Sequence, residues 1–467
     1  MKNAIVQFTM QISDRSPSDS TVSQSPRRRV LIVSPHFPPT NAPDHQRIRV
    51  ALPYLSALGW EAEILAVQPH HVPHPVDPKL AEALPTDLPI VRTEALQRQH
   101  TSWIALGNVG WRCLPYFQQQ GDRLLETKAF DLVFFSTTIF PVMTLGKRWH
   151  HRFGIPYVLD FQDPWRSDYH LSGNPKKQQD KPPGGWLKYG MTQFLARLCE
   201  PQAMQTVNHI ISVSPTYPQI LQQRYPWLQS DQFTVLPFGA PEHDFAQLPQ
   251  LNIRQSIFDP NDGKKHWVYV GRGGADMATA LRILFLGIQT SRQSCPELWQ
   301  DVQLHFVGTS YAPDHLAVKT VEAIAQEYDV ADLVTEHTRR IPYFEAQQLL
   351  VDSDAILMIG SDDPSYTASK LYPCILAKKP ILAIFHEQSS VVNILNQCQA
   401  GQVVTFAQDI DPVTRCSEMA VCLNELLKLP RYYQPPTCWD AFRPYTAREM
   451  TRQLCEVFEQ TVQRAAA

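Results

Sequence analysis

Short runs of apolar residues alternate with segments of helical spacing along most of this chain. In the first half, apolar runs typical of buried strands occupy residues 30–34, 62–67, 132–136, 157–161 and 210–213. The segments with helical spacing lie between them, at 44–58, 142–153 and 186–206. Pro53 falls inside the first of these segments and is expected to bend or split that helix. Apolar strands that alternate with helices indicate a parallel sheet covered on both faces.

The pattern lapses over residues 239–265, which are polar and contain prolines, and it then restarts. Apolar runs of strand type return at 267–270, 304–307, 355–359, 381–385 and 403–406. We therefore expect an α/β protein with two doubly wound, Rossmann-like domains facing a central cleft. Ligands of such sheets bind beyond the carboxyl ends of the strands, so this cleft is the expected site.

The domain boundaries are expected where the pattern starts, lapses and ends. Residues 1–29 are polar and lack the apolar core of a signal peptide, so we expect a disordered N-terminal tail. An N-terminal domain at 30–240, a linker at 241–265 and a C-terminal domain at 266–438 follow. Residues 439–462 have the spacing of one long helix within a last segment, 439–467.

Composition excludes several classes of function. The formal net charge of −3 argues against a large nucleic-acid surface. The nine cysteines are widely spaced without a Cys-x-x-Cys pair, which indicates reduced thiols in the cytoplasm. No apolar run reaches the roughly 20 residues that span a bilayer. Arg27, Arg28 and Arg29 would suit peripheral contact with the inner membrane surface, although a solvated strand entrance is the favoured interpretation.

One lysine follows a polar, turn-rich loop and precedes a short apolar helix within residues 361–385. This order predicts Lys370 in the first turn of a helix, where backbone N–H groups and the ammonium attract anions. A phosphate or diphosphate site and a solvated lysine are equally good interpretations of this stretch alone.

A glycine-rich turn, GRGGAD, follows the strand at 267–270. Gly271 allows a ligand to approach the backbone, and Arg272 can hydrogen-bond a diphosphate. The G-x-G-x-x-G spacing of dinucleotide sites is absent. A tight turn with a surface arginine is the alternative interpretation.

Other candidates follow two strands of the first half. Asp163 comes after the strand at 157–161 and would act as a base or bind a sugar hydroxyl, while Trp165 would stack on a sugar ring. An Asp-Pro turn explains Asp163 equally well. After the strand at 30–34, Asp44 and Arg47 begin a helix expected to face the cleft. His36 is a candidate acid or base there, although a structural role is favoured.

We expect no metal site. The Asp-x-Asp pattern at 352–354 lies at a helix end, where capping explains it. The proline-rich surroundings of His70, His71 and His74 indicate an ordinary surface loop.

In ordered combination these motifs resemble the GT-B glycosyltransferases, specifically the retaining family 4-like group. The resemblance rests on Phe37-Pro38-Pro39, Arg47, Leu55, Leu58 and Gly59, on residues 154–165 (GIPYVLDFQDPW), on Tyr269-Val270-Gly271-Arg272, on Arg340-Ile341-Pro342-Tyr343, and on Lys370 with Lys379-Pro380. It implies a cytoplasmic, metal-independent hexosyltransferase without a cofactor, which builds a polysaccharide or glycolipid from a nucleotide-sugar donor and a glycan or lipid-linked acceptor.

The resemblance also implies roles for individual residues. The C-terminal domain would hold the donor and the N-terminal domain the acceptor, and the C-terminal helix would cross back onto the N-terminal domain. Asp163 would be catalytic. The implied contacts are Gly271, Arg272, Ser369 and Lys370 for the diphosphate, Arg340, Ile341, Asp363, Ser365 and Tyr372 for the nucleotide or sugar, and Pro39, Asp44, Arg47 and Trp165 for the acceptor.

One departure from the family pattern keeps alternatives open. The family's ribose-binding glutamate is replaced by Pro373. A non-catalytic GT-B module that binds a nucleotide-sugar or glycan is therefore the second hypothesis, and a nucleotide-sugar 2-epimerase is the third.

Overall fold

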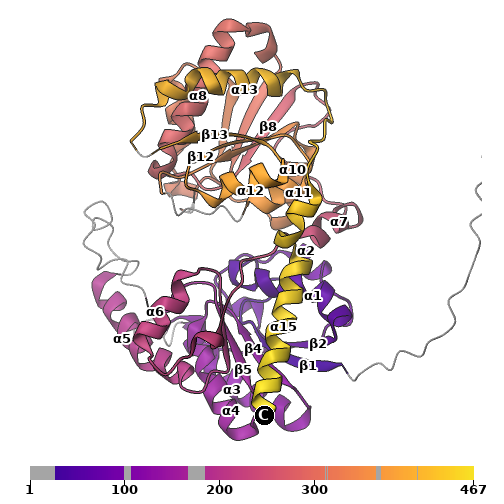
Figure 1. The fold of residues 1–467 in the computed structure, drawn as a ribbon, viewed down its shortest axis with the longest axis vertical. Helices are drawn as coiled ribbons and strands as arrows, with labels where there is room; N and C mark the ends of the chain where they lie inside the picture. The colour runs from indigo at the N-terminus through magenta and orange to yellow at the C-terminus, as the bar shows by residue number, and fades with distance from the viewer. Residues whose placement is uncertain are drawn as a thin grey trace, which may run out of the picture.

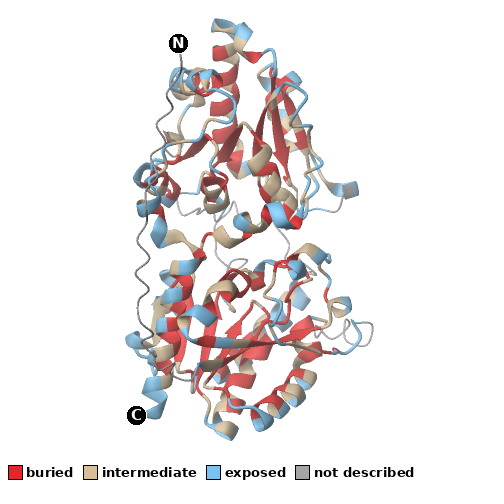
Figure 2. Cartoon of the chain, turned by 90° about the vertical axis from the view of Figure 1, so that its right-hand side faces the viewer, coloured by how far each residue is buried: buried red, intermediate tan, exposed pale blue. Residues whose placement is uncertain are grey.

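Two parallel sheets, one in each half of the chain, form the two lobes of the computed structural model (Figure 1). The structure describes residues 27–98, 107–166, 185–310, 312, 314–363, 370–407 and 409–467. Most of the predicted tail therefore lies outside the described residues, as do Ser365 and Ser369. Buried residues concentrate in the centre of each lobe (Figure 2), so each half of the chain has its own core.

The N-terminal sheet has seven parallel strands in the order β3-β2-β1-β4-β5-β6-β7. Its strands are β1 (Arg28–Val33), β2 (Trp60–Val67), β3 (Ile90–Thr93), β4 (Leu132–Ser136), β5 (Tyr157–Phe161), β6 (His209–Ser212) and β7 (Phe233–Val235). The winding reverses between β1 and β4, which is the switch point where doubly wound sheets bind ligands.

Helices cover both faces of this sheet. The helices are α1 (Gln46–Leu55), α2 (Pro78–Glu82), α3 (Val109–Thr127), α4 (Thr144–Phe153), α5 (Gly185–Met204), α6 (Thr216–Arg224) and, from the end of the chain, α15 (Ala447–Ala466). Successive residues of a strand point to opposite faces. Leu31 and Val33 pack in the core that includes α3 and α4, and Val30 and Ile32 pack in the core that includes α1 and α15. Burial on both faces explains why the predicted strand is continuously apolar.

The C-terminal sheet repeats this winding with six parallel strands in the order β10-β9-β8-β11-β12-β13. Its strands are β8 (Lys265–Val270), β9 (Val302–Val307), β10 (Val334–His337), β11 (Ala355–Ile359), β12 (Ile381–His386) and β13 (Gln402–Phe406). Its helices are α8 (Ala278–Ser294), α9 (Thr320–Glu327), α10 (Tyr343–Asp352), α11 (Leu371–Leu376), α12 (Ser390–Cys398) and α13 (Cys416–Lys428). The two doubly wound sheets confirm the predicted fold class.

The chain crosses between the lobes twice, and the two crossings lie side by side. The Ala240 N–H donates to the Tyr445 carbonyl at 2.7 Å, and the Ala447 N–H donates to the Ala240 carbonyl at 2.8 Å. Beyond this point α15 runs along the N-terminal lobe (Figure 1), where the Phe458 ring meets Trp60 edge-on at 5.2 Å. The end of the chain therefore contributes to the N-terminal core.

Several predicted boundaries differ from the structure. The predicted linker at 241–265 contains a helix, α7 (Glu242–Leu251). The single helix predicted at 439–462 is two helices, α14 (Trp439–Phe442) and α15, because Pro444 lies between them and cannot continue a helix. Pro53 does not split α1, which continues to Leu55.

The arginines assigned to the tail lie at the start of β1, which begins at Arg28. Each forms an ion pair, and the pairs are Arg27–Glu61 at 3.7 Å, Arg28–Glu459 at 3.2 Å and Arg29–Glu63 at 3.4 Å. These pairs favour the strand-entrance interpretation over a membrane contact. Among the described residues, none of the helices has the length and apolar character to cross a membrane.

Candidate active site

A cavity of about 1190 Å³ lies at the carboxyl ends of the N-terminal strands. Its wall includes His36 after β1, His71 after β2, Glu94 after β3 and Thr138 after β4. Parallel strands end at one edge of the sheet, which is why loops distant in sequence meet here. Helix α5 closes one side with Lys188, Thr192, Leu195 and Ala196. The cavity is therefore at the place where the fold is expected to bind a ligand.

His36 and Asp44 form a buried pair in the wall of this cavity. His36 Nδ1 lies 3.1 Å from Asp44 Oδ1, and Thr137 Oγ1 donates to Asp44 Oδ2 at 2.8 Å. Burial raises the pKa of Asp44, but the hydrogen bonds from His36 and Thr137 and the charge of His36 outweigh it, so the pKa is lowered. Because the ionised carboxylate only accepts hydrogen bonds, Nδ1 carries a proton, and Nε2 is the atom that can accept a hydrogen bond when the ring carries a single proton. Nε2 is buried and has no hydrogen-bond partner among the described residues.

The side chain of Arg47 does not point into a site for a sugar acceptor, contrary to prediction. Its side chain is fully buried, and Nε donates to Asp160 Oδ2 at 2.8 Å. Its terminal nitrogens donate to the carbonyls of Leu236 at 2.7 Å and Pro237 at 3.3 Å. Protein acceptors surround the guanidinium, so Arg47 stabilises the core between β5 and the chain that leaves β7.

The other candidate residues of the N-terminal lobe have different surroundings. Trp165 lines the cavity, with one face stacked on Phe140 at 5.3 Å, so the indole is held as a wall. Pro39 is half-buried, and its carbonyl accepts from the Asp77 N–H at 2.7 Å, which makes it part of the loop's support. Asp163 is exposed, and desolvation together with the nearby charge of Asp44 raises its pKa. Asp163 therefore lies close to the His36–Asp44 pair.

The glycine-rich turn of the C-terminal lobe holds its arginine against an aspartate. Arg272 donates to Asp276 Oδ1 at 2.9 Å and to Oδ2 at 2.6 Å, and Ser361 Oγ donates to Oδ2 at 2.7 Å. The hydrogen bond from Arg272 lowers the pKa of Asp276. A Cβ on Gly271 would lie 2.4 Å from the Tyr269 hydroxyl, so this position requires glycine. The turn thus presents a positioned, charged guanidinium at the end of β8.

Lys370 is the N-cap residue of α11. It therefore immediately precedes the helix and does not lie in its first turn, where it was predicted. It retains exposed surface, yet desolvation and the charges of Arg340 and Arg272 lower the pKa of its ammonium to about 8. Both guanidinium groups are therefore within electrostatic range of the Lys370 ammonium. The strand ends of the C-terminal lobe therefore bring together a triad of cations from three loops: Arg272, Arg340 and Lys370.

The remaining donor-side candidates have different surroundings. Asp363 is exposed, with its N–H donating to Ser361 Oγ at 3.1 Å. Ile341 is half-buried against the apolar core beside α10. Tyr372 stacks on Tyr445 at 5.7 Å, so its ring supports the crossing between the lobes and is not placed as a nucleotide contact.

His74 is affected by charges of both lobes. Its ring meets the His36 ring edge-on at 5.1 Å. Desolvation and the charge of His36 lower the pKa of His74, and the positive charge of Arg340 contributes in the same direction. Arg340 of the cation triad is therefore within electrostatic range of His74, which adjoins the His36–Asp44 pair.

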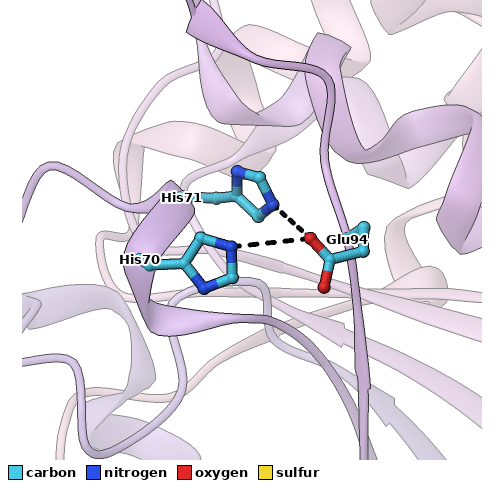
Figure 3. A group of neighbouring side chains, drawn as sticks. All are labelled: His70, His71 and Glu94. Carbon is cyan, nitrogen blue, oxygen red and sulfur yellow. Dashed lines mark hydrogen bonds and ion pairs between the residues drawn. The ribbon is translucent and has the colours of Figure 1, made fainter.

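The sequence gives too little weight to two features of this candidate site. A structural role for His36 is favoured from the sequence, because its partner Asp44 is eight residues away in a proline-rich loop whose path the sequence does not predict. Glu94 was missed altogether, since β3 was not predicted and nothing in the sequence placed this carboxylate beside His70 and His71 (Figure 3).

Two doubly wound lobes joined by a double crossing, with the last helix packed on the first lobe, define a GT-B fold. No protein-family model matches the sequence, and no curated protein matches it significantly.

Solved structures with this fold cover nearly the whole chain. The HepE protein of Anabaena, in complex with UDP and glucose, has a TM-score of 0.53 and 13% identity over 93% of this chain and 100% of its own. A UDP-forming trehalose-phosphate synthase of Burkholderia xenovorans has a TM-score of 0.52 and 10% identity, over 92% and 100%. A UDP-N-acetylglucosamine 2-epimerase (described as putative) of Listeria monocytogenes has a TM-score of 0.51 and 8% identity, over 94% and 97%. These likenesses establish the fold.

Proposed function

We propose that this protein is a glycosyltransferase that moves a hexosyl group from a nucleotide-diphosphate sugar to a glycan or lipid-linked acceptor. The observation that carries the proposal is the triad of Arg272, Arg340 and Lys370, whose Arg340 is within electrostatic range of His74 beside the His36–Asp44 pair. A sugar bound through its diphosphate to the triad would extend toward a buried imidazole acceptor. UDP-hexoses are the first donors to test, because UDP and glucose are bound in the similar HepE structure.

In this proposal the cations neutralise the leaving diphosphate without a metal ion at that position. Charge develops on the bridging oxygen as the glycosidic bond breaks, and fixed cations in a site shielded from water stabilise it. The low pKa of Lys370 supports this role, because three mutually repelling cations gain most when an anion binds between them.

His36 is proposed to accept a hydrogen bond from a sugar hydroxyl through Nε2. Asp44 holds the ring and its tautomer through Nδ1. Asp163, next to this pair, is proposed to bind a second hydroxyl. We propose transfer with retention of the anomeric configuration. Nuclear magnetic resonance of the first product tests this, since an inverted product would make His36 the general base that deprotonates the acceptor.

A lipid-linked acceptor, with peripheral contact at the cytoplasmic membrane face, is supported by helix α5. One side of α5 lines the cavity, while Leu187 is 89% exposed. The other exposed apolar residues of the helix are Trp186, Met191, Phe194 and Leu198. Lys188 and Arg197 are also exposed on it. Aromatic, aliphatic and basic residues together favour an interface with anionic lipid, at the edge of the proposed acceptor cavity.

A non-catalytic nucleotide-sugar-binding module is the second candidate. It is favoured by Tyr372 and Pro373, which lie in α11 where the family places its ribose-binding glutamate, while Tyr372 packs on Tyr445. Ribose contacts would then have to come from another part of the site.

A thermal-shift and turnover screen of the full chain with UDP-, GDP- and ADP-sugars tests these functions. We expect stabilisation by one nucleotide and release of that nucleotide when an acceptor is present. Stabilisation without turnover for glycan and lipid-linked acceptors alike would favour the binding module. Conversion of the donor sugar into its 2-epimer, without transfer, would identify an epimerase.

A further inference from the structure

Three side chains with metal-binding atoms converge at the edge of the N-terminal cavity (Figure 3). Glu94 Oε2 lies 2.6 Å from His71 Nε2 and 3.5 Å from His70 Nε2. The three atoms all lie within 4.8 Å of one another. Both imidazoles thus direct their Nε2 atoms at one carboxylate oxygen.

The sheet and a buried arginine hold the loops that carry these residues. Strands β2 and β3 pair in parallel, with Val67 opposite Thr93, so both loops leave the same edge of the sheet. Arg112 of α3, which is buried, donates to the His71 carbonyl at 2.7 Å and to the Leu96 carbonyl at 2.9 Å. One guanidinium therefore ties the histidine loop to the glutamate loop, which is the support that a preformed ligand set requires.

We propose that His70, His71 and Glu94 bind one divalent transition-metal ion, with zinc as the best match. Two imidazole nitrogens and one carboxylate oxygen suit zinc and its neighbours, whereas magnesium and calcium prefer oxygen ligands only. Tetrahedral coordination at about 2.0–2.1 Å places ligand atoms roughly 3.3 Å apart. His71 and Glu94 must separate by less than 1 Å to reach that spacing (roughly 0.7 Å). The largely exposed side chains of His70 and Glu94 have room to make this adjustment.

Three protein ligands leave a fourth coordination position open, as in zinc sites that bind water or a substrate. All three residues line the cavity, so an oxygen ligand could reach this position from the cavity. The ion would be on the N-terminal lobe, apart from the cation triad at the proposed diphosphate position. Metal binding by these residues does not depend on the proposed transfer reaction.

Isothermal titration calorimetry with zinc sulfate, on full chain freed of metal by EDTA and gel filtration, tests the site. We expect one saturable site, with at least a tenfold loss of affinity in His70→Ala, His71→Ala and Glu94→Gln, since even outer-shell changes cost about 10–100-fold. His151→Ala is the matched control, because His151 also belongs to an adjacent histidine pair and is exposed on α4. It should bind zinc like the parent.

Cobalt substitution provides a second readout that weak surface binding does not produce. Cobalt bound by the three residues should give the strong visible absorption of a four-coordinate site, and inorganic phosphate should shift it by occupying the open position. The absence of saturable zinc binding, or equal affinity in Glu94→Gln, His71→Ala and the parent, would overturn the proposal. Sugar transfer measured in the same preparations separates this outcome from a failure of the proposed function.

Discussion

If Lys370 binds the diphosphate as proposed, the affinity for a nucleoside diphosphate should depend on pH in a window where few other groups titrate. Its pKa is lowered to about 8, against an ordinary value of 10.5. The ammonium is therefore about nine-tenths charged at pH 7 and about one-tenth charged at pH 9. Only the charged form attracts the diphosphate, so the favourable contribution is present below pH 8 and lost as the pH rises through 8. We expect the affinity for UDP to fall up to about tenfold between pH 7 and pH 9.

The neighbouring groups do not produce this slope. Arginine side chains in general keep their proton below about pH 12, so they do not contribute to a slope between pH 7 and 9. Burial raises the pKa of the Cys374 thiol to about 12, so it stays neutral. The pKa of His74 is lowered from 6.5, so its ring is neutral throughout. The terminal phosphate of UDP has a second pKa of about 6 and is almost fully ionised at pH 7.

Titration calorimetry with UDP at pH 7, 8 and 9 and constant ionic strength measures the effect. Lys370→Ala should bind about tenfold more weakly at pH 7 and lose the slope, since it lacks the titrating group. Lys370→Arg keeps its charge over the whole range and should bind with little change between pH 7 and 9. A flat profile for the parent, or an unchanged slope in Lys370→Ala, would refute the assignment of Lys370 to the diphosphate.

Three further predictions concern the rest of the site. Arg272→Ala and Arg340→Ala should each weaken UDP binding about tenfold or more. EDTA should leave the UDP affinity of the parent unchanged. A strong EDTA effect on that affinity would place a metal at the diphosphate. His36→Ala should lower kcat for transfer by roughly 100-fold with little change in UDP affinity, and a parent-like kcat would make His36 structural. Leu187→Ser and Phe194→Ser should each weaken binding to anionic liposomes roughly tenfold or more. Tm should not change, because both side chains are exposed in the absence of lipid. Unchanged liposome binding would show that α5 is not the membrane contact.

Strands buried on both faces could be predicted from the sequence, and so could the apolar edge strand β13, whereas the three other edge strands could not. The predicted apolar runs at 30–34 and 132–136 match β1 and β4 in the middle of the sheet. The strands without a prediction, β3, β7 and β10, are at the edges of their sheets and have three or four residues each. An edge strand is partly solvated and can carry polar side chains, so its sequence lacks the apolar run that marks a central strand.

The loops after central strands could be identified as candidate sites, but the direction of each side chain could not. The apolar pattern predicts that Asp44 and Arg272 follow strand ends. In the structure each lies beside other polar groups at the carboxyl edge of its own sheet. Arg47 shows the limit of this reasoning. It lies three residues after Asp44 and shares its burial, yet its partners are Asp160 and two backbone carbonyls from a segment 190 residues away. Only the tertiary fold distinguishes a site residue from a core residue here.

The same short helix that carries Arg47 also forms the joint between the lobes. Arg49 of α1 donates to both carboxylate oxygens of Asp244 in α7, at 2.8 and 2.7 Å. Its guanidinium lies 4.4 Å from the ring centroid of Tyr343 at the start of α10, and the Tyr343 hydroxyl donates to Asp244 at 2.7 Å. One buried cation therefore links the N-terminal lobe, the linker helix and the C-terminal lobe.

This joint bears directly on the proposed chemistry. Asp44 lies two residues before the start of α1, and Arg340 lies three residues before the start of α10, so each proposed site residue is within five residues of one side of the Arg49–Tyr343 contact. A change in the angle between the lobes must move α10 relative to α1, and it would carry Arg340 relative to the His36–Asp44 pair. In the proposed reaction, the distance between the leaving diphosphate and the acceptor hydroxyl would therefore depend on this joint, where Arg49 contacts Asp244 and Tyr343.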